Sequence, residues 1–346
     1  MRDAGRRCSA LGATLSVVPT VVRGPQTWRS ARRWVLVCLG LAVAGLTASA
    51  CSNGPSSVSY VVVPHPDDEM QAWSLIEDTP DTYKVFIMLT RGEQTAYCVS
   101  PGFDEATGEA QPYPWPASRF SSACEEARRN SFFEFMAAMA ESDSGLPSSF
   151  DYEGVKGPFH SLGYQVCRHD VLDYDDEDCV VDLTAEVWTS PQATVVWFNL
   201  GDGDLTANEV TWAITTVQEN QTALGIDSDL PATSLIGASF WNTGHPDCFI
   251  YEHDDHFAVR AALWHIDFGV EQQLAATCRT DPDASRHEQV SLAVFDRAFE
   301  TASATRIGAH AVFYGWLWGE PPGYWPGAYD GQDELFHRHQ SFWVLK

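Results

Sequence analysis

A buried strand that runs directly into a group of metal-binding side chains constrains this chain more than any other feature of its sequence. Residues 60–63 are aromatic or β-branched, which favours a strand that is covered on both faces. Two prolines end the strand, because a proline nitrogen cannot donate a hydrogen bond to a neighbouring strand. His65, Asp67 and Asp68 therefore follow the carboxyl end of a strand, where ligand sites collect in open α/β sheets.

These three side chains have the chemistry of a metal site. One imidazole and two carboxylates within four residues suit a borderline ion such as zinc. Adjacent side chains of an extended segment point in opposite directions, so one of Asp67 and Asp68 can bind the ion while the other stays free. A turn rich in Asp and Pro would explain a single His-Pro-Asp sequence. The second aspartate makes a metal site the preferred interpretation.

A second polar cluster, residues 253–256, lies at the start of a predicted helix that runs to about residue 267. His253 and His256 are three positions apart, which on the first turn of a helix directs both rings toward one side. The backbone donors and the macrodipole favour carboxylates at the same place. Taken alone, the cluster could also be a set of capping residues at the surface.

Together the two clusters resemble the signature of the LmbE-like N-acetylglucosaminyl-phosphatidylinositol de-N-acetylases, a family of zinc amidases. Residues 64–69 read Pro-His-Pro-Asp-Asp-Glu, which is similar to the opening motif of that family. Residues 253–259 resemble its H-x-D-H-x-A-V motif, and residues 89–93 are similar to its second strand and T-x-G-E turn. The resemblance spans most of residues 58–270.

The resemblance implies a set of ligands and a base. His65, Asp68 and His256 are expected to bind zinc and to leave positions open for water, as a catalytic zinc ion requires. Another divalent metal would also suit these donors. Asp67 is then expected to act as the general base.

The resemblance also implies roles for three further residues. His253, oriented by Asp255, is expected to stabilise the oxyanion or to protonate the leaving amine. An arginine on a helix of the family contacts substrate, and Arg128 on the predicted helix 122–140 is the nearer match to it. The glutamate that follows this arginine in the family pattern is missing here.

The implied reaction is hydrolysis of an N-acetyl group, a linear amide, on an amino sugar or glycoconjugate, with release of acetate and a free amine. A surface lipoprotein that binds a sugar or a metal without turnover is a second hypothesis, and an amidase acting on a non-sugar amide is a third. The presence of Asp67 favours an enzyme, because a binding protein needs no general base. We expect the insertions at 98–120, 142–179 and 316–335 to determine specificity.

The order of the predicted elements indicates the fold class. Strands at 58–63, 84–89, 194–200 and 235–241 alternate with helical patterns. This alternation predicts an α/β fold, a Rossmann-like three-layer sandwich with a mostly parallel sheet and the zinc site at the carboxyl edge of the strands. We expect a single domain over residues 58–346.

Two further acidic segments need an interpretation. Asp202 and Asp204 leave the end of the strand 194–200 and could approach the site, although turn chemistry accounts for them. Residues 173–178 form an acidic run that could bind calcium, but the run lacks the glycine of an EF-hand loop. A solvated acidic loop is the preferred interpretation.

The charge balance excludes one class of partner. The chain has 21 Lys and Arg residues against 47 Asp and Glu residues, a formal net charge of −26. Nucleic acid is therefore not expected as a partner, because binding phosphates requires a basic surface. We expect the partner to be an N-acetylated small molecule or glycan.

Residues 1–50 have the layout of a secretory signal peptide, in which basic residues precede an apolar run that ends in Ala48-Ser49-Ala50. Cys51 follows directly, as in a bacterial lipobox, and residues 51–57 have the small polar composition of a tether. We expect an exported protein that contacts the membrane only through a lipid on Cys51, on the extracytoplasmic side. Cleavage without lipidation, which would give a secreted protein, and an uncleaved anchor are the alternatives; the apolar run is short for an anchor.

Six cysteines lie beyond the signal peptide and Cys51, and an even number in an exported chain indicates disulfides. Six cysteines allow many connectivities. We expect neighbours along the chain to pair, because each pair brackets an irregular segment whose freedom the bond would limit. The expected pairs are Cys98–Cys124, Cys167–Cys179 and Cys248–Cys278.

Overall fold

The computed structural model describes residues 54–94, 121–160, 162–163, 166–170, 173–180, 183–239, 253–277, 286–289 and 339–346. Contacts divide the chain into two units, Met1–Ser52 and Asn53–Lys346. The expected signal peptide, Cys51 and the insertions at 98–120 and 316–335 lie outside the described residues. Within the described ranges, no helix combines the length and the apolar composition that crossing a membrane requires.

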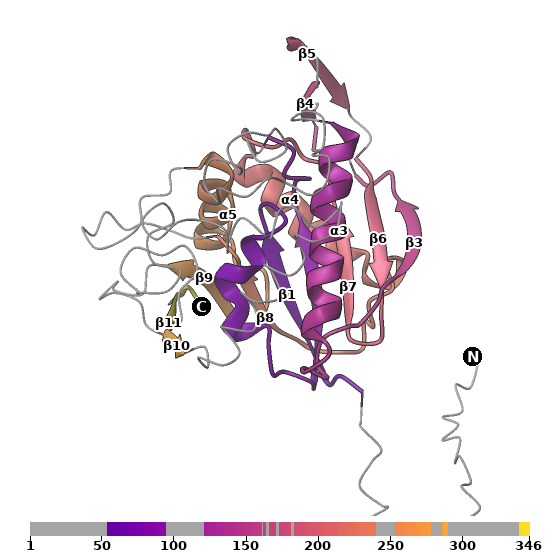
Figure 1. Ribbon diagram of the computed structural model, residues 1–346. Coiled ribbons are helices and arrows are strands. Elements are labelled where there is room, and N and C mark those ends of the chain that lie inside the picture. Colours follow the sequence, from indigo (N-terminus) through magenta and orange to yellow (C-terminus); the bar gives the residue numbers. More distant parts are fainter. Residues whose placement is uncertain are drawn as a thin grey trace, which may run out of the picture. The chain divides into compact units, whose positions relative to one another are not determined.

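The described part of the second unit alternates strands with helices (Figure 1). In chain order, with η for a 3-10 helix, the elements are β1 (Ser57–Val63), η1 (Asp68–Leu75), β2 (Thr82–Met88), α3 (Ser122–Met139), β3 (Asp151–Lys156), β4 (Val166–Asp170), β5 (Asp173–Val180), β6 (Ala185–Thr189), β7 (Ala193–Trp197), α4 (Ala207–Glu219), η3 (Gln221–Leu224), β8 (Ala232–Gly237), α5 (Asp254–His265), β9 (Gln272–Thr277), β10 (Arg286–Gln289) and β11 (His339–Val344).

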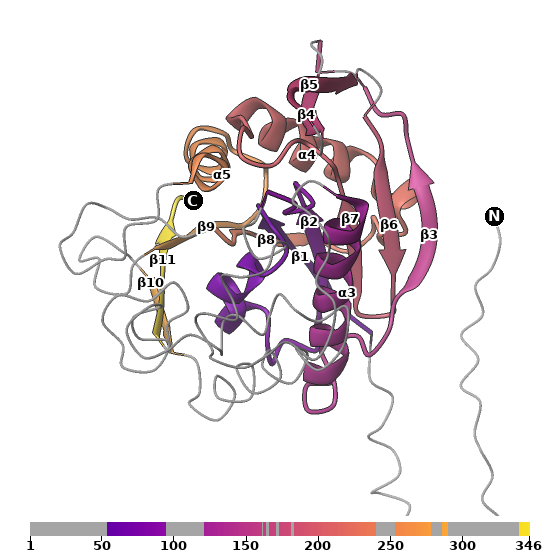
Figure 2. The ribbon, with the colours of Figure 1, turned by 45° about the horizontal axis from the view of Figure 1, so that its top comes forward.

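Nine of these strands form one sheet, in the order β10-β11-β9-β8-β1-β2-β7-β6-β3. The central strands β9, β8, β1, β2 and β7 pair in parallel. Two strands at each edge pair antiparallel, β10 and β11 on one side and β6 and β3 on the other (Figure 2). The predicted α/β fold is confirmed, and the antiparallel edges are an addition that the sequence patterns did not indicate.

Helices cover both faces of the sheet, which makes three layers. Val61 and Val63 of β1 pack in a core cluster with residues of η1 and α3. Tyr60 and Val62 of the same strand pack in a second cluster with residues of α4 and α5. Successive side chains of a strand point to opposite faces, so an uninterrupted apolar run is what a strand between two helical layers needs. The prediction that residues 60–63 are buried on both faces is confirmed.

Local capping explains where the helices begin. Ser121 precedes α3 and accepts a hydrogen bond from the backbone nitrogen of Cys124. Thr206 and Glu209 form the predicted capping box at the start of α4, with both reciprocal bonds present. His253 is the N-cap of α5, so the predicted start of that helix is confirmed.

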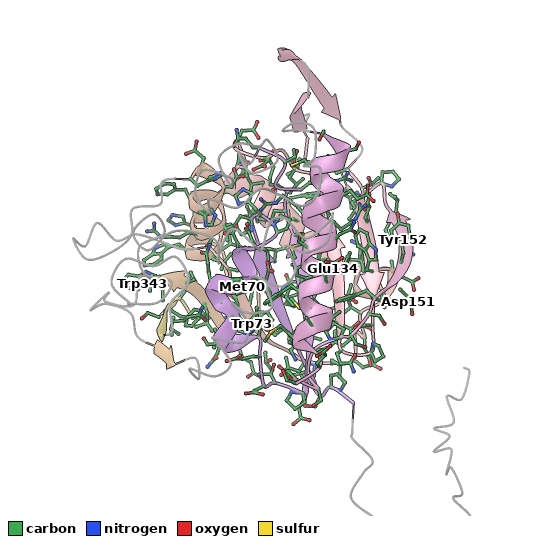
Figure 3. All side chains as sticks on the ribbon, in the orientation of Figure 1. Met70, Trp73, Glu134, Asp151, Tyr152 and Trp343 are labelled. Carbon is green, nitrogen blue, oxygen red and sulfur yellow. The ribbon has the colours of Figure 1, made fainter. Side chains whose placement is uncertain are left out.

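The insertion at 142–179 contains strands that we did not predict. β3 lies at the edge of the large sheet, where Asp151 and Tyr152 are labelled in Figure 3, and β4 pairs with β5 in a separate two-stranded sheet. The prediction of a loop over residues 173–178 is therefore wrong, because antiparallel pairing with β4 makes a strand of an acidic run that lacks apolar alternation.

The disulfide predictions are tested in part. Cys124 forms a disulfide, and its expected partner Cys98 lies outside the described residues. The register of β4 and β5 places residues 167 and 179 directly opposite each other, as a bridge between them would require. Cys248 and Cys278 lie outside the described residues.

Candidate metal centre

Three segments that are far apart in the sequence supply the candidate site. The first follows the carboxyl end of β1, the second follows β7 at residues 201–204, and the third is the first turn of α5. The parallel strands β1 and β7 end at the same edge of the sheet, since β2 pairs in parallel with both. The site therefore lies at the carboxyl edge of the central strands, as predicted.

The three predicted metal ligands come together. Asp68 Oδ2 lies 2.9 Å from His65 Nδ1 and 3.2 Å from His256 Nε2. All three side chains are buried, and one donor atom from each lies within 4.8 Å of the others. A tetrahedral zinc ion with ligands at about 2.0–2.1 Å separates neighbouring donors by roughly 3.3 Å. The two Asp68 distances are close to this value, so the donor set fits a metal ion, although the geometry does not identify which one.

The other ring nitrogen of His65 faces two carboxylates. His65 Nε2 lies 2.8 Å from Asp255 Oδ2 and 3.1 Å from Asp202 Oδ1. A carboxylate next to one nitrogen of a metal-binding histidine fixes the proton there and leaves the other nitrogen for the ion. An ion held with Asp68 and His256 would therefore take Nδ1 of His65 as its ligand and leave the proton on Nε2.

His65, Asp202, His253 and Asp255 also form a group that could hold a metal ion. Both candidate groups use His65, but through different nitrogens. A single ion beside either nitrogen requires only the ordinary neutral ring, whereas an ion in both groups would require a doubly deprotonated imidazole. We interpret Asp202 and Asp255 as partners that orient His65, because the group with Asp68 and His256 is the one expected from the sequence.

The electrostatics of the cluster also favour a cation. Burial alone would lower the pKa of His65, but Asp202, Asp255 and Asp68 raise it well above its usual range. Burial opposes ionisation of Asp68, yet His256 and His65 hold the pKa of that carboxyl well below its usual range. Three buried carboxylates around one imidazole carry an excess of negative charge, which a divalent ion would neutralise.

Asp255 connects the three segments. Besides its contact with His65, its carboxylate accepts hydrogen bonds from Gly203 N at 2.9 Å and Leu205 N at 3.0 Å. The pKa of Asp255 falls to about 2, because the contact with His65 outweighs burial. The first turn of α5 is thereby tied to the turn that follows β7.

The expected orientation of His253 by Asp255 takes an unexpected form. The Asp255 carboxylate contacts His65, while the backbone N–H of Asp255 donates to His253 Nδ1 at 3.4 Å. Burial, together with the neighbouring His65, lowers the pKa of His253 to about 4. His253 is therefore neutral at pH 7, and its proton lies on Nε2, since Nδ1 accepts the backbone bond.

Asp67 and Arg128 lie beside each other. Arg128 is buried, and its guanidinium nitrogen donates to the Pro66 carbonyl and lies 3.2 Å from Asp67 Oδ2. Asp67 has φ 114°, which is uncommon for a residue other than glycine, and its N–H donates to Glu69 Oε2 at 2.9 Å. The predicted contact of Arg128 with substrate stays a prediction, because the guanidinium is engaged by the loop that carries Asp67.

Two buried residues were not assigned to the site from the sequence. Asp202 was attributed to turn chemistry, yet it contacts His65 and accepts a bond from Gln94 N at 2.6 Å. Burial, reinforced by the charges of Asp202 and Glu125, raises the pKa of Glu93 to about 8. The available signal for Asp202 was its position after a buried strand, which turn statistics outweighed.

Comparison of the chain with protein-family models, with curated proteins and with solved structures gives no match. The fold and the geometry of the buried cluster are thus the observations on which a function can be based.

Proposed function

We propose that this protein is a metal-dependent amidohydrolase that removes an acetyl group from the nitrogen of an amino sugar or glycoconjugate, with zinc as the ion. The observation that carries the proposal is that two adjacent aspartates have different partners. Asp68 contacts the buried side chains of His65 and His256, whereas Asp67 forms an ion pair with the guanidinium of Arg128. A metal-binding protein needs only the first of these carboxylates, and a hydrolase needs both.

Each residue has a task in amide hydrolysis. His65 through Nδ1, Asp68 and His256 would hold the ion. When bound, zinc lowers the pKa of a water molecule and polarises a carbonyl. Asp67 takes the proton of the attacking water and passes it to the nitrogen of the breaking C–N bond, which gives acetate and a free amine.

His253 acts as a hydrogen-bond donor in this proposal. A neutral ring with its proton on Nε2 donates to the oxygen that gains negative charge as the carbonyl is attacked. Protonation of the leaving amine would require His253 to hold two protons, and its pKa of about 4 opposes that at neutral pH. The oxyanion role is therefore the better supported of the two expected roles.

Acetate release by metal-loaded protein tests the proposal. The substrates would be free N-acetylglucosamine, an N-acetylglucosamine glycoside and an N-acetylated non-sugar amide, each with and without prior removal of metal by a chelator. We expect release from a sugar substrate that stops on chelation and returns with Zn²⁺. Release from the non-sugar amide alone would change the substrate class, and no release from any of the three by metal-loaded protein would contradict the proposal.

A further inference from the structure

We infer that Arg128 is a positioning residue for Asp67 and not a contact for substrate. This inference rests on the proposed function in one respect, namely that Asp67 is the base. It differs from the role that the sequence resemblance implied for Arg128, and it follows from how the loop between β1 and η1 is held.

The guanidinium of Arg128 binds to that loop. It donates to the carbonyl of Pro66 and pairs with Asp67 Oδ2 at 3.2 Å, so it contacts two consecutive residues. The Arg128 side chain is only 4% exposed. Both contacts are made by one terminal nitrogen, Nη2, so they depend on where the side chain places that atom. The shorter side chain of lysine would not place its ammonium nitrogen at the same point.

Asp67 needs such support because its backbone is strained. With φ 114° and ψ −25°, it adopts a conformation that side chains other than glycine rarely take, and such conformations persist only where the surroundings enforce them. Its N–H is held by the fully buried Glu69, and its carboxylate is held by Arg128. The two contacts fix both the backbone and the side chain of the candidate base.

The turn after β2 holds the arginine from the other side. Gly92 has φ +64°, and a Cβ atom at this position would lie 2.4 Å from Arg128 Nε. Thr90 of the same turn donates from Oγ1 to the Pro64 carbonyl at 2.9 Å. The turn over residues 90–93 thus packs against the guanidinium and against the loop that the guanidinium supports, which gives a structural reason for the glycine in this turn.

The neighbouring arginine provides a matched control. Arg129 Nη1 lies 3.3 Å from Glu186 Oε2, and the Arg129 side chain is 28% exposed. It belongs to the same helix and carries the same charge, but its ion pair is with β6. Replacing Arg129 therefore removes a charge of α3 without disturbing the Asp67 loop.

Steady-state kinetics separates positioning from substrate binding. We would measure acetate release from the N-acetylglucosamine glycoside by metal-loaded wild type, Arg128→Gln and Arg129→Gln. A positioning role predicts that Arg128→Gln lowers kcat by about 10²-fold, the usual cost of a misplaced reacting group, while KM stays within about twofold. Arg129→Gln should match the wild type. A tenfold or larger rise in KM for Arg128→Gln with kcat retained would overturn the inference.

Arg128→Lys serves if the Gln variant does not fold, because the lysine keeps the charge and most of the apolar stem. It should also lower kcat with KM unchanged, and a kcat equal to that of the wild type would overturn the inference.

Crystal structures of wild type and Arg128→Lys give a readout that needs no activity. We expect Asp67 to leave its positive φ or its carboxylate to turn away from the position it has in the wild type. An unchanged Asp67 in the variant would overturn the inference. If the wild type releases no acetate from any substrate, the proposed function fails, and these structures still decide whether Arg128 positions Asp67.

Discussion

At the scale of single residues, the candidate site is organised around His65, whose two ring nitrogens face different carboxylates. The Nδ1 atom lies beside Asp68 and the Nε2 atom lies beside Asp255 and Asp202, so the ring is held from both ends. Partners of this kind orient a metal-binding imidazole and increase its basicity. Asp202 should therefore affect metal binding although it is not among the three expected ligands.

Replacement of Asp202 by Asn tests this relation. The variant should bind Zn²⁺ about 10 to 100-fold more weakly, because an amide orients the imidazole less firmly than a carboxylate does. Affinity is measured by competition with a chromophoric chelator. Asp204→Asn is the control, since Asp204 is exposed in the same turn. Equal zinc affinity for wild type and Asp202→Asn would show that Asp202 does not act on the ion through His65.

A second prediction concerns Glu77, a buried residue to which we assign no role in the candidate site. Burial, together with the charges of Asp78 and Asp143, raises its pKa from 4.5 to about 7. Between pH 4.5 and 7 the folded protein therefore keeps a proton on Glu77, whereas the unfolded chain has lost it. The ionisable Glu77 side chain thus lowers the stability of the protein as the pH rises from 4.5 through 7. Glu77→Gln should melt at a higher temperature than wild type at pH 8, and at the same temperature at pH 4.5.

Thermal unfolding of both proteins across this pH range checks the Glu77 prediction. Glu141→Gln, which removes an exposed carboxylate beyond α3, is the control. A Glu77→Gln variant that is no more stable than wild type at pH 8 would mean that burial does not disfavour the charge at this position.

At the scale of elements, α3 connects the core to the loop that carries Asp67. Phe132 is fully buried, and its ring centroid lies 5.4 Å from that of Phe86 on β2 and 6.1 Å from that of Trp197 on β7. Met70 and Trp73, labelled on η1 in Figure 3, belong to the same core cluster. The helix that supplies Arg128 is thus anchored to the two strands that precede the polar turns.

Phe132→Ala should lower the free energy of unfolding by about 3–5 kcal/mol, since it deletes a buried ring from a packed core and leaves a cavity. Urea denaturation measures the loss. Phe257→Ala removes the same group from a position on α5 that is 41% exposed, and it should cost much less. Equal losses for the two variants would contradict the packing described for α3.

The elements also show how far the sequence could predict the fold. Four of the five central strands, β1, β2, β7 and β8, were predictable because burial between two helical layers leaves long apolar runs, as in residues 60–63. The fifth, β9, was not predicted, because its sequence begins with two glutamines and contains no such run. The antiparallel edges were not, because an edge strand such as β3 is largely exposed and lacks that pattern. The acidic strand β5 shows the same limit, since its pairing with β4 is absent from its own sequence.

The residues of the candidate site could likewise be predicted only in part. His65, Asp67 and Asp68 were predictable because they follow one strand, and His253, Asp255 and His256 because their spacing suits the first turn of a helix. The contact of Asp202 with His65 joins two separate turns, so only the folded chain reveals it. The engagement of Arg128 by Asp67 is likewise a product of tertiary packing.

At the scale of the whole molecule, the sequence predicts an exported lipoprotein. A basic and apolar leader is followed by small residues and Cys51, and then by a polar segment. Cys51→Ser should move the protein from the membrane fraction to the soluble fraction of the producing bacterium, because it removes the lipid attachment site. Membrane association that persists in the variant, with residues 1–50 still present by mass spectrometry, would indicate an uncleaved anchor instead.

The central claim is that the fold divides two adjacent carboxylates between metal binding and proton transfer. Asp68 contacts both candidate histidine ligands, and Asp67 contacts Arg128. The most direct test measures bound metal by elemental analysis, and acetate release, for Asp67→Asn and Asp68→Asn side by side. We predict that Asp67→Asn keeps its metal while acetate release falls by about 10²–10⁴-fold, and that Asp68→Asn loses the metal. Loss of metal from Asp67→Asn but not from Asp68→Asn would contradict this account.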